Sequence, residues 1–403
     1  LLKVNAVKLL DRHPNYGKDV TAYIKENPHA TLRQLLVLMA ANAKVGTHLI
    51  FDHALGGGAN IYTNELREKY VEEGKNVLLV QYDFYSHTFT LSHRYKIYDF
   101  KFKISNFSEL QTFINKLHLR EVFINNLVSY ANTFELLDYI YTLISKNTTN
   151  LILPIHDFYT LSPSYNLLNE EGKYNLQDCL DNTKMSANMQ EWRNFYSDDV
   201  DMPKWKAIWT KLFDSSHKVL CFSNSSKNIV LEAYPSIEKK ITVSPHIVEC
   251  ISPIVLEKDP NKTITTIGVL GAIDYVKGAQ IVKQIVQLID RNHLDIHIVV
   301  IGEITEQISS KHFKVTGRYK RKKLPQLIEE HKVDIFLIPS IIPETFSYTT
   351  QEIIMMEQPL MVFDLGAPAE RVAKYDKGYI IEEISAKAIL EVIKKFQAKI
   401  ETI

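Results

Sequence analysis

The chain has 403 residues, of which 45% are hydrophobic and 23% are charged, a composition typical of globular proteins and a length that exceeds one ordinary domain. Its 47 Lys and Arg residues balance its 47 Asp and Glu residues, so the net charge of zero argues against a nucleic-acid partner bound through overall charge. The three cysteines, Cys179, Cys221 and Cys250, have no metal-ligand spacing and form no disulfide framework, which indicates a reducing compartment such as the cytoplasm.

The first half of the chain is predicted to be a helical extension followed by an α/β domain over residues 46–245. Residues 1–45 are polar and helical in pattern, with one apolar stripe over residues 31–41. Strands are expected at 47–52, 76–82, 121–124, 151–155 and 218–222, and helices at 61–73, 107–117, 133–145, 203–214 and from 223 onward. Alternation of this kind predicts a parallel sheet with helices on both faces.

A polar, irregular segment, residues 157–203, is longer than most connections, so we expect a functional lid or a mobile insertion there. Residues 246–263 are predicted to be a linker to a second α/β domain over residues 264–403. Its strands are expected at 264–270, 296–301, 334–338, 360–363 and 379–381, and its helices at 278–290, 323–331, 347–357 and 385–399. Two doubly wound parallel sheets in tandem would face a cleft, the usual ligand site of such sheets.

Two glutamates eight residues apart, Glu344 and Glu352, mark the most informative segment. An apolar strand runs up to Pro339, Glu344 follows in a loop, and a helix is expected to begin at residues 345–347. A helix that begins after a strand offers free N–H groups and the positive end of its dipole, which suit a phosphate. Carboxylates on either side of that phosphate can bind the hydroxyls of a sugar and of a ribose.

Other segments extend this pattern, namely residues 266–278, 315–319, 343–352 and 363–371. Together they resemble the donor domain of the GT-B glycosyltransferases, most closely the retaining family four that includes bacterial polysaccharide, capsule and O-antigen transferases. The resemblance is strong over residues 264–383 and weaker at the glycines 56–58 and at His156-Asp157. It does not cover residues 1–45 or 160–200.

The resemblance implies roles for individual residues on both sides of the cleft. Glu344 would lie near the transferred sugar, Glu352 would hold the nucleotide ribose, and Lys277 would neutralise the donor diphosphate. His156 would lie near the sugar and the acceptor, although a structural histidine is an equally good interpretation. The other donor-binding positions are Gly56, Gly57, Gly58, Gly271, Gly317, Arg318, Thr345, Phe346 and Ser347.

The sequence departs from the family pattern at two places. Many members place an arginine after the first strand of the donor domain, where this chain has Ala272 and Ile273. We expect Arg318 or another basic residue to compensate, or phosphate binding to be weaker. The second departure is the basic run 320–323, where an acidic segment would be usual; we expect it to be a solvated helix start.

Two further patterns are interpreted as structural. Asp199 and Asp201 have the D-x-D spacing of some metal sites, but they lie in a polar segment away from any strand end, so no metal is expected. The helical stripe Trp205, Ile208, Trp209, Leu212 and Phe213 favours core packing over a peripheral membrane contact.

The sequence therefore predicts a cytoplasmic glycosyltransferase, with the inner face of the membrane as an alternative location. It would move a sugar with retention from a nucleotide-sugar to a saccharide or glycolipid acceptor, without a cofactor. A non-catalytic carbohydrate-binding domain of a larger polymerase, and a nucleotide-sugar epimerase or hydrolase, are the alternatives. Because the chain opens at Leu1, we also expect it to be part of a longer multidomain protein. The sugar, base, linkage and acceptor are left open.

Overall fold

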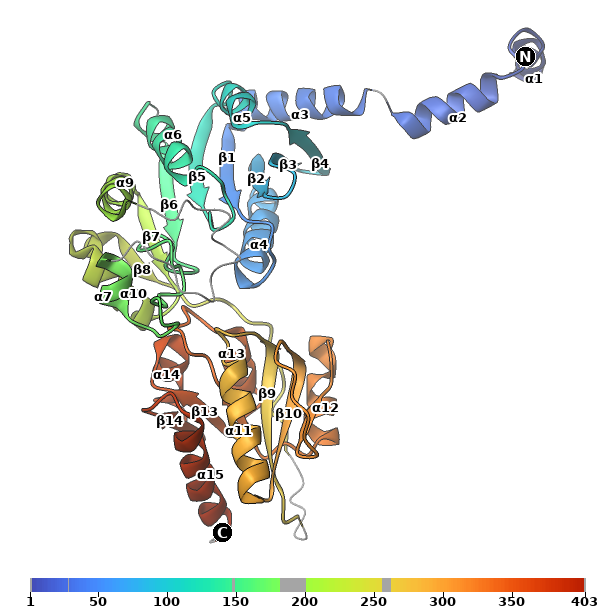
Figure 1. Cartoon of the computed structure of the whole chain (residues 1–403). Helices are drawn as coiled ribbons and strands as arrows, with labels where there is room; N and C mark the ends of the chain where they lie inside the picture. Colours follow the sequence, from blue (N-terminus) through green and yellow to red (C-terminus); the bar gives the residue numbers. More distant parts are fainter. Residues whose placement is uncertain (1, 28, 147–148, 182–200, 256–261, 402–403) are drawn as a thin grey trace.

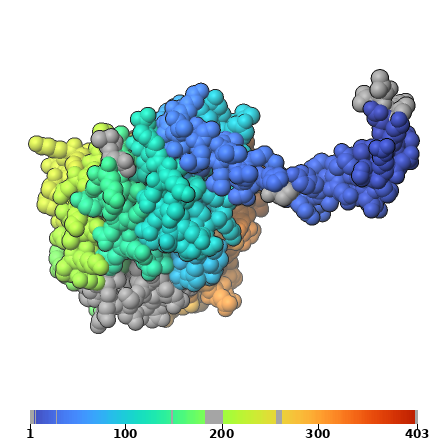
Figure 2. All heavy atoms as spheres, turned by 90° about the horizontal axis from the view of Figure 1, so that it is seen from above, coloured from blue at the N-terminus to red at the C-terminus, as the bar shows by residue number. Residues whose placement is uncertain are grey.

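The computed structural model describes residues 2–27, 29–146, 149–181, 201–255 and 262–401. It consists of two α/β domains stacked end to end and a helical arm that projects from the N-terminal domain (Figure 1). The arm contains α1 (Leu2–Arg12), α2 (Tyr16–Glu26) and α3 (Ala30–Val45). Only α3 joins the domain, through the buried side chains of Leu38 and Ala41. Figure 2 shows the rest of the arm extending away from the molecule.

The N-terminal domain is built on an eight-stranded sheet with the order β4-β3-β2-β1-β5-β6-β7-β8. Its strands are β1 (Thr47–Asp52), β2 (Val77–Asp83), β3 (Thr88–Tyr95), β4 (Tyr98–Ile104), β5 (Leu119–Ile124), β6 (Asn150–Pro154), β7 (Lys218–Cys221) and β8 (Ile241–Val243). Its helices are α4 (Gly58–Glu72), α5 (Phe107–Ile114), α6 (Thr133–Lys146), α7 (Leu176–Asp181), α9 (Met202–Ser215), α10 (Asn224–Ala233) and the 3-10 helix η2 (Pro235–Lys240).

This sheet is not parallel throughout, which corrects the prediction. Strands β3 and β4 form an antiparallel hairpin on β2, and neither was predicted. Strand β4 forms the sheet edge, with Tyr98 and Asp99 exposed and, within this strand, Ile104 alone buried. An edge strand with a solvated face lacks the continuous apolar run of a central parallel strand, so its sequence resembles a loop.

The C-terminal domain contains a six-stranded, fully parallel sheet with the order β11-β10-β9-β12-β13-β14. Its strands are β9 (Thr265–Ile273), β10 (Ile296–Ile304), β11 (Phe313–Val315), β12 (Ile335–Ile338), β13 (Leu360–Phe363) and β14 (Gly378–Ile381). Its helices are α11 (Ala279–Asn292), η3 (Arg321–Lys323), α12 (Leu324–Glu330), α13 (Tyr348–Met355), α14 (Gly366–Val372) and α15 (Ala386–Glu401). Helix α14 and strand β11 were not predicted.

Apolar side chains on both faces of each sheet form the two cores. In the C-terminal domain, Ile298 and Val300 pack under α11 and α15, while Phe336 and Ile338 pack on the opposite face. The predicted stripe on α9 is buried, with Trp209 only 1% exposed, so its interpretation as core packing is confirmed. None of the helices in the described part of the chain combines the length and the apolar character needed to cross a bilayer.

Candidate active site

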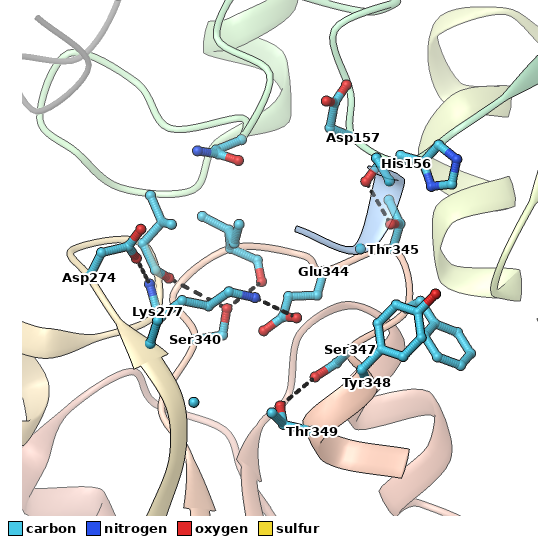
Figure 3. A pocket seen from close by; sticks show the side chains of 18 of the residues that line it. His156, Asp157, Asp274, Lys277, Ser340, Glu344, Thr345, Ser347, Tyr348 and Thr349 are labelled. Atoms are coloured by element: carbon cyan, nitrogen blue, oxygen red, sulfur yellow. Dashed lines mark hydrogen bonds and ion pairs between the residues drawn. The ribbon is translucent and has the colours of Figure 1, made fainter. Parts of the chain in front are cut away.

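A cavity of about 470 Å³ lies between the two domains, where the carboxyl ends of strands from both sheets meet (Figure 3). Its C-terminal wall is formed by the end of β9 and the turn that follows it, within residues 270–277, and by the end of β12, the loop after it and the start of α13, within residues 338–349. Its N-terminal wall is formed by His53, Gly56, Gly58, Ala59, Asn126, His156, Asp157, Phe158, Tyr165, Asn166 and, from the linker, His246. The carboxyl ends of parallel strands are the position at which open α/β sheets bind ligands.

The C-terminal wall is centred on an ion pair between Lys277 and Glu344, whose Nζ and Oε2 atoms are 2.7 Å apart. The Lys277 side chain is 38% exposed to the cavity, whereas that of Glu344 is only 8% exposed. The turn before α11 positions the lysine, because the Asp274 carboxylate accepts a hydrogen bond of 2.9 Å from the Lys277 amide. Gly278 follows with a positive φ of 85°, and a Cβ there would meet the Pro339 carbonyl oxygen. Two tight loops therefore bring together two residues that the sequence analysis had assigned separate roles, Lys277 at the diphosphate and Glu344 at the sugar.

The loop that carries Glu344 is held from below by the start of α14. The Ala367 amide donates a hydrogen bond of 2.8 Å to the Glu344 carbonyl oxygen. Gly366 has a positive φ of 65°, and a Cβ there would lie 2.7 Å from the Glu344 nitrogen. Glycine is therefore the residue that lets the two backbones approach this closely.

The start of α13 faces the cavity next to the ion pair. Ser347 occupies the N-cap position with φ 68° and ψ 96°, and its side chain makes no capping hydrogen bond. Its hydroxyl accepts instead from the Thr350 hydroxyl at 2.9 Å. Since the first N–H groups of a helix have no intrahelical acceptors, Ser347, Tyr348 and Thr349 present donors and a positive dipole end to the cavity.

On the N-terminal wall, the glycine loop is fixed by a buried aspartate that the sequence analysis did not identify. Asp52 accepts hydrogen bonds from Asn60 Nδ2 at 2.6 Å and from Thr63 Oγ1 at 2.8 Å. Asn60 in turn accepts from the Gly56 amide at 2.6 Å, so the carboxylate sets the loop through one intermediary. Burial raises the pKa of Asp52. At Gly58, a Cβ would lie 2.9 Å from the Tyr348 ring of the other domain.

His156 lines the cavity, but its ring lies in an aromatic cluster and points away from the Lys277–Glu344 pair (Figure 3). The ring stacks on Phe222, with centroids 4.7 Å apart, and on His246, at 5.4 Å. Its Nε2 atom lies 2.9 Å from Asn125 Oδ1. Burial holds the pKa of His156 well below its ordinary value, so the imidazole is neutral at pH 7. The backbone carbonyl accepts a hydrogen bond of 2.9 Å from the Thr345 hydroxyl across the domain boundary.

Asp157 is the carboxylate of the N-terminal wall, and from the sequence it was noted only as the neighbour of His156. It lies across the cavity from the Lys277–Glu344 pair (Figure 3). Its two oxygens accept hydrogen bonds from Asn126 Nδ2 at 2.5 Å and from the Tyr159 amide at 2.9 Å. Burial raises the pKa of Asp157 to about 6. The sequence did contain a signal for this residue, namely a carboxyl side chain shortly after the end of a predicted strand.

Four predicted donor-binding residues, Gly57, Gly317, Arg318 and Glu352, do not line the cavity. Glu352 pairs with Arg321 of the basic run, with the carboxylate oxygen and Nε 2.7 Å apart, and burial raises its pKa. Arg318 pairs with Glu303 at 2.8 Å and is 87% exposed. Arg318 therefore does not supply a second cation to the cavity in this structure.

The departure at Ala272 and Ile273 leaves the cavity with a single lysine. Among the described lining residues, Lys277 is the only Lys or Arg. Arg371 lies just behind the wall, where its guanidinium stacks 3.7 Å from the Phe346 ring centroid and donates to the Ser347 carbonyl at 3.1 Å. Burial lowers the pKa of Arg371 to about 10, so it remains protonated at neutral pH.

Of the D-x-D pair, the structure describes Asp201, which does not line the cavity. Asp201 caps α9 by accepting a hydrogen bond of 2.9 Å from the Lys204 amide, and Asp199 lies outside the described residues. In the part of the chain that the structure describes, no three His, Cys, Asp or Glu side chains are grouped so as to hold a metal ion.

Comparisons with known proteins place this geometry in a family context. Residues 255–400 match the family described as "Glycosyl transferases group 1". No curated protein matches the chain. The solved structure of Anabaena Alr3699/HepE with UDP-glucose is similar, with a TM-score of 0.53, 12% identity, and coverage of 88% of this chain and 91% of that chain. Sucrose-phosphate synthase from Thermosynechococcus elongatus gives 0.56 and 11%, covering 88% and 90%.

These similarities establish the fold. At identities this low, the similarity shows the architecture alone. That architecture is the GT-B fold, with two Rossmann-like domains facing a cleft, and it confirms the fold predicted from the sequence. The family match covers the C-terminal domain, which contributes the Lys277–Glu344 wall of the cavity.

Proposed function

We propose that the chain is a glycosyltransferase that moves a sugar from a nucleotide-sugar to a hydroxyl of a saccharide or glycolipid acceptor in the cytoplasm. The observation that carries the proposal is the Lys277–Glu344 pair beside the uncapped start of α13, in the cavity between the two GT-B domains. The family matched by residues 255–400 and the UDP-glucose bound by Alr3699/HepE support the donor class. We further assign the chain to bacterial surface polysaccharide synthesis, on the resemblance alone.

In this proposal the C-terminal wall binds the donor. Lys277 and the N–H groups at the start of α13 stabilise the departing diphosphate, because fixed cations and dipoles act strongly where negative charge develops. Glu344 accepts hydrogen bonds from the transferred sugar, while its bond to Lys277 holds the carboxylate in place. On the resemblance we keep Glu352 as the residue that holds the ribose; it lies beyond the lining of the cavity and shares its carboxylate with Arg321.

The N-terminal wall binds the acceptor. Asp157 lies across the cavity from the ion pair, Asn126 lines the same wall and donates to it, and both offer hydrogen-bond partners for a sugar hydroxyl. His156 contributes its neutral ring to the aromatic cluster, and its carbonyl anchors Thr345 next to Glu344. We therefore propose that His156 is a positioning residue and that Asp157 contacts the acceptor directly.

We propose transfer with retention and without a metal ion. The bond between the anomeric carbon and the phosphate oxygen breaks, the acceptor oxygen bonds to the same face of that carbon, and the acceptor proton passes to the departing phosphate. No side-chain nucleophile is required. If Asp157 accepted the proton on the opposite face instead, the product would be inverted. Nuclear magnetic resonance of the newly formed anomeric centre distinguishes the two outcomes.

A non-catalytic carbohydrate-binding role is the second candidate, and one observation favours it. The single lysine of the cavity is already paired with Glu344, so a diphosphate would find little uncompensated positive charge there. Calorimetry with a panel of nucleotides and nucleotide-sugars separates the candidates. Nucleotide binding that is abolished in Lys277→Ala supports the transferase, and absence of all nucleotide binding supports the second role. Turnover of a nucleotide-sugar without any acceptor would indicate an epimerase or hydrolase.

A further inference from the structure

Helix α14 lies at the boundary between the two domains. It belongs to the C-terminal domain but packs against α10 of the N-terminal domain (Figure 1). Its first residues support the Glu344 loop through the hydrogen bond from the Ala367 amide. The consecutive residues Glu370 and Arg371 near its end make the contacts that matter here.

Glu370 caps a helix of the other domain. Its Oε2 atom accepts a hydrogen bond of 2.7 Å from the Ser225 amide, and its Oε1 atom accepts one of 2.8 Å from the Asn224 side chain. The local cap of α10 is already formed, because the Ser223 hydroxyl accepts from the Ser226 amide at 3.0 Å. Glu370 therefore satisfies a different N–H group of the first turn, which is otherwise left without an intrahelical acceptor.

The electrostatic setting favours an ionised carboxylate at this position. Burial by itself would raise the pKa of Glu370, but the hydrogen bonds from Ser225 and Asn224 outweigh it and hold the pKa below its ordinary value. A carboxylate at the positive end of a helix dipole, bonded to N–H donors, is one of the stronger polar contacts in proteins.

Arg371 points from the same helix toward the site, since successive helical residues are rotated by about 100°. It stacks on Phe346 and bonds the carbonyl of Ser347, the residue whose positive φ turns the chain into α13. One short helix thus links α10 of the N-terminal domain to the loop that presents the diphosphate-binding N–H groups.

We propose that Glu370 is a positioning residue that holds the N-terminal wall of the cavity at a fixed separation from the C-terminal wall, with Arg371 fixing the donor loop on the same helix. The inference extends the proposed function and rests on it only where transfer is measured. Two other described hydrogen bonds cross the boundary, from Thr345 to the His156 carbonyl and from Tyr275 to the Gly172 carbonyl. Each of these two bonds joins neutral groups. Of the three described contacts across the boundary, the one made by Glu370 is therefore the charge-assisted contact.

The first test needs no substrate. Glu370→Ala, Glu370→Gln and the matched control Glu391→Ala, an exposed glutamate on α15, are compared by hydrogen exchange and small-angle scattering. We expect the Ser225 amide to exchange about tenfold faster in Glu370→Ala, with a larger radius of gyration, because a lost charge-assisted bond frees both groups. Glu370→Gln retains one acceptor oxygen and should restore part of the protection. Unchanged exchange and radius in Glu370→Ala would overturn the proposal.

The second test uses transfer kinetics. We expect kcat to fall about tenfold in Glu370→Ala, while the donor dissociation constant stays within twofold, because reaction geometry is lost and donor contacts are kept. A parallel loss in donor affinity, or unchanged kcat with faster exchange, would show a merely structural contact and contradict the positioning role. If the parent protein transfers no sugar, the proposed function fails, whereas exchange and scattering still decide whether Glu370 joins the domains.

Discussion

The two walls of the cavity are built in opposite ways. The C-terminal wall carries charge at its surface, with Lys277 and Glu344 paired at the cavity and a helix end beside them. The N-terminal wall has no lysine or arginine among its described lining residues; it presents the Asp157 carboxylate to the cavity, while Asp52 orders the glycine loop from beneath the surface. The charged C-terminal wall, with its lysine and helix end, suits an ionic donor, and the N-terminal wall suits a hydroxyl-bearing acceptor, so substitutions on the two walls should affect different kinetic constants.

The largest effect is expected on the charged wall. Lys277→Ala should lower kcat/KM for transfer about a thousandfold and weaken nucleotide binding, because the cavity loses its lysine while Glu344 becomes an unpaired buried charge. Titration calorimetry and initial rates measure both constants. The matched control is Lys283→Ala, which removes a lysine of α11 that pairs with Glu306 at 2.9 Å outside the cavity. Equal losses in the two variants would contradict the assignment.

On the N-terminal wall, Asp157→Asn should raise the acceptor KM and lower kcat by about tenfold, with donor affinity unchanged, because one hydrogen-bond acceptor facing the cavity is lost. Initial rates at varied acceptor concentration report the effect. A change confined to the donor KM would show that Asp157 contacts the donor and would contradict its assignment to the acceptor.

The same variant tests the pH dependence of stability. The folded-state pKa of Asp157 is raised to about 6, so the folded protein binds a proton more tightly than the unfolded chain between about pH 4 and pH 6. Stability should therefore fall as pH rises through this window, and the parent should lose about 1–2 kcal/mol relative to Asp157→Asn between pH 4 and pH 8. Urea unfolding at both pH values measures this difference. A constant difference would contradict the shift.

The smallest effect on catalysis is expected at His156. His156→Phe keeps an aromatic ring in the cluster but removes the partner of Asn125 Oδ1, so unfolding should become easier by about 1–3 kcal/mol. Transfer at 25 °C should fall by less than about tenfold, because the ring faces away from the ion pair. Urea midpoints and initial rates check the two parts. A loss of activity that matches Lys277→Ala would restore His156 to a direct catalytic role.

The charged C-terminal wall was largely predictable from the sequence, whereas the N-terminal wall was not. Central parallel strands such as β10 and β12 are continuous apolar runs, and Glu344 lies in the loop that follows β12, so both the strand and the loop could be located. Asp52 acts through Asn60 on Gly56, a contact that depends on a loop folding back on its strand. No spacing in the sequence reports such a contact.

The other differences between the predicted and the observed site arise because side chains pair with residues from distant segments of the chain. Arg371 meets Phe346 only because α14 packs under the loop before α13, and α14 itself is a short helix that follows a strand without a clear cap. The pairing of Glu352 with Arg321 likewise joins segments about thirty residues apart. Arg318 was expected near the nucleotide but pairs with Glu303, which is also charged and exposed.

The most direct measurement is a screen of nucleotide-sugars and saccharide acceptors by product mass, run in parallel on the parent protein and on Glu344→Gln. Glutamine keeps the shape of the side chain but removes the charge that pairs with Lys277. We predict that one donor gives a transfer product with the parent, and that Glu344→Gln binds the same nucleotide but transfers about a hundredfold more slowly. Near-parental transfer by Glu344→Gln with the true donor would contradict the role of the Lys277–Glu344 pair.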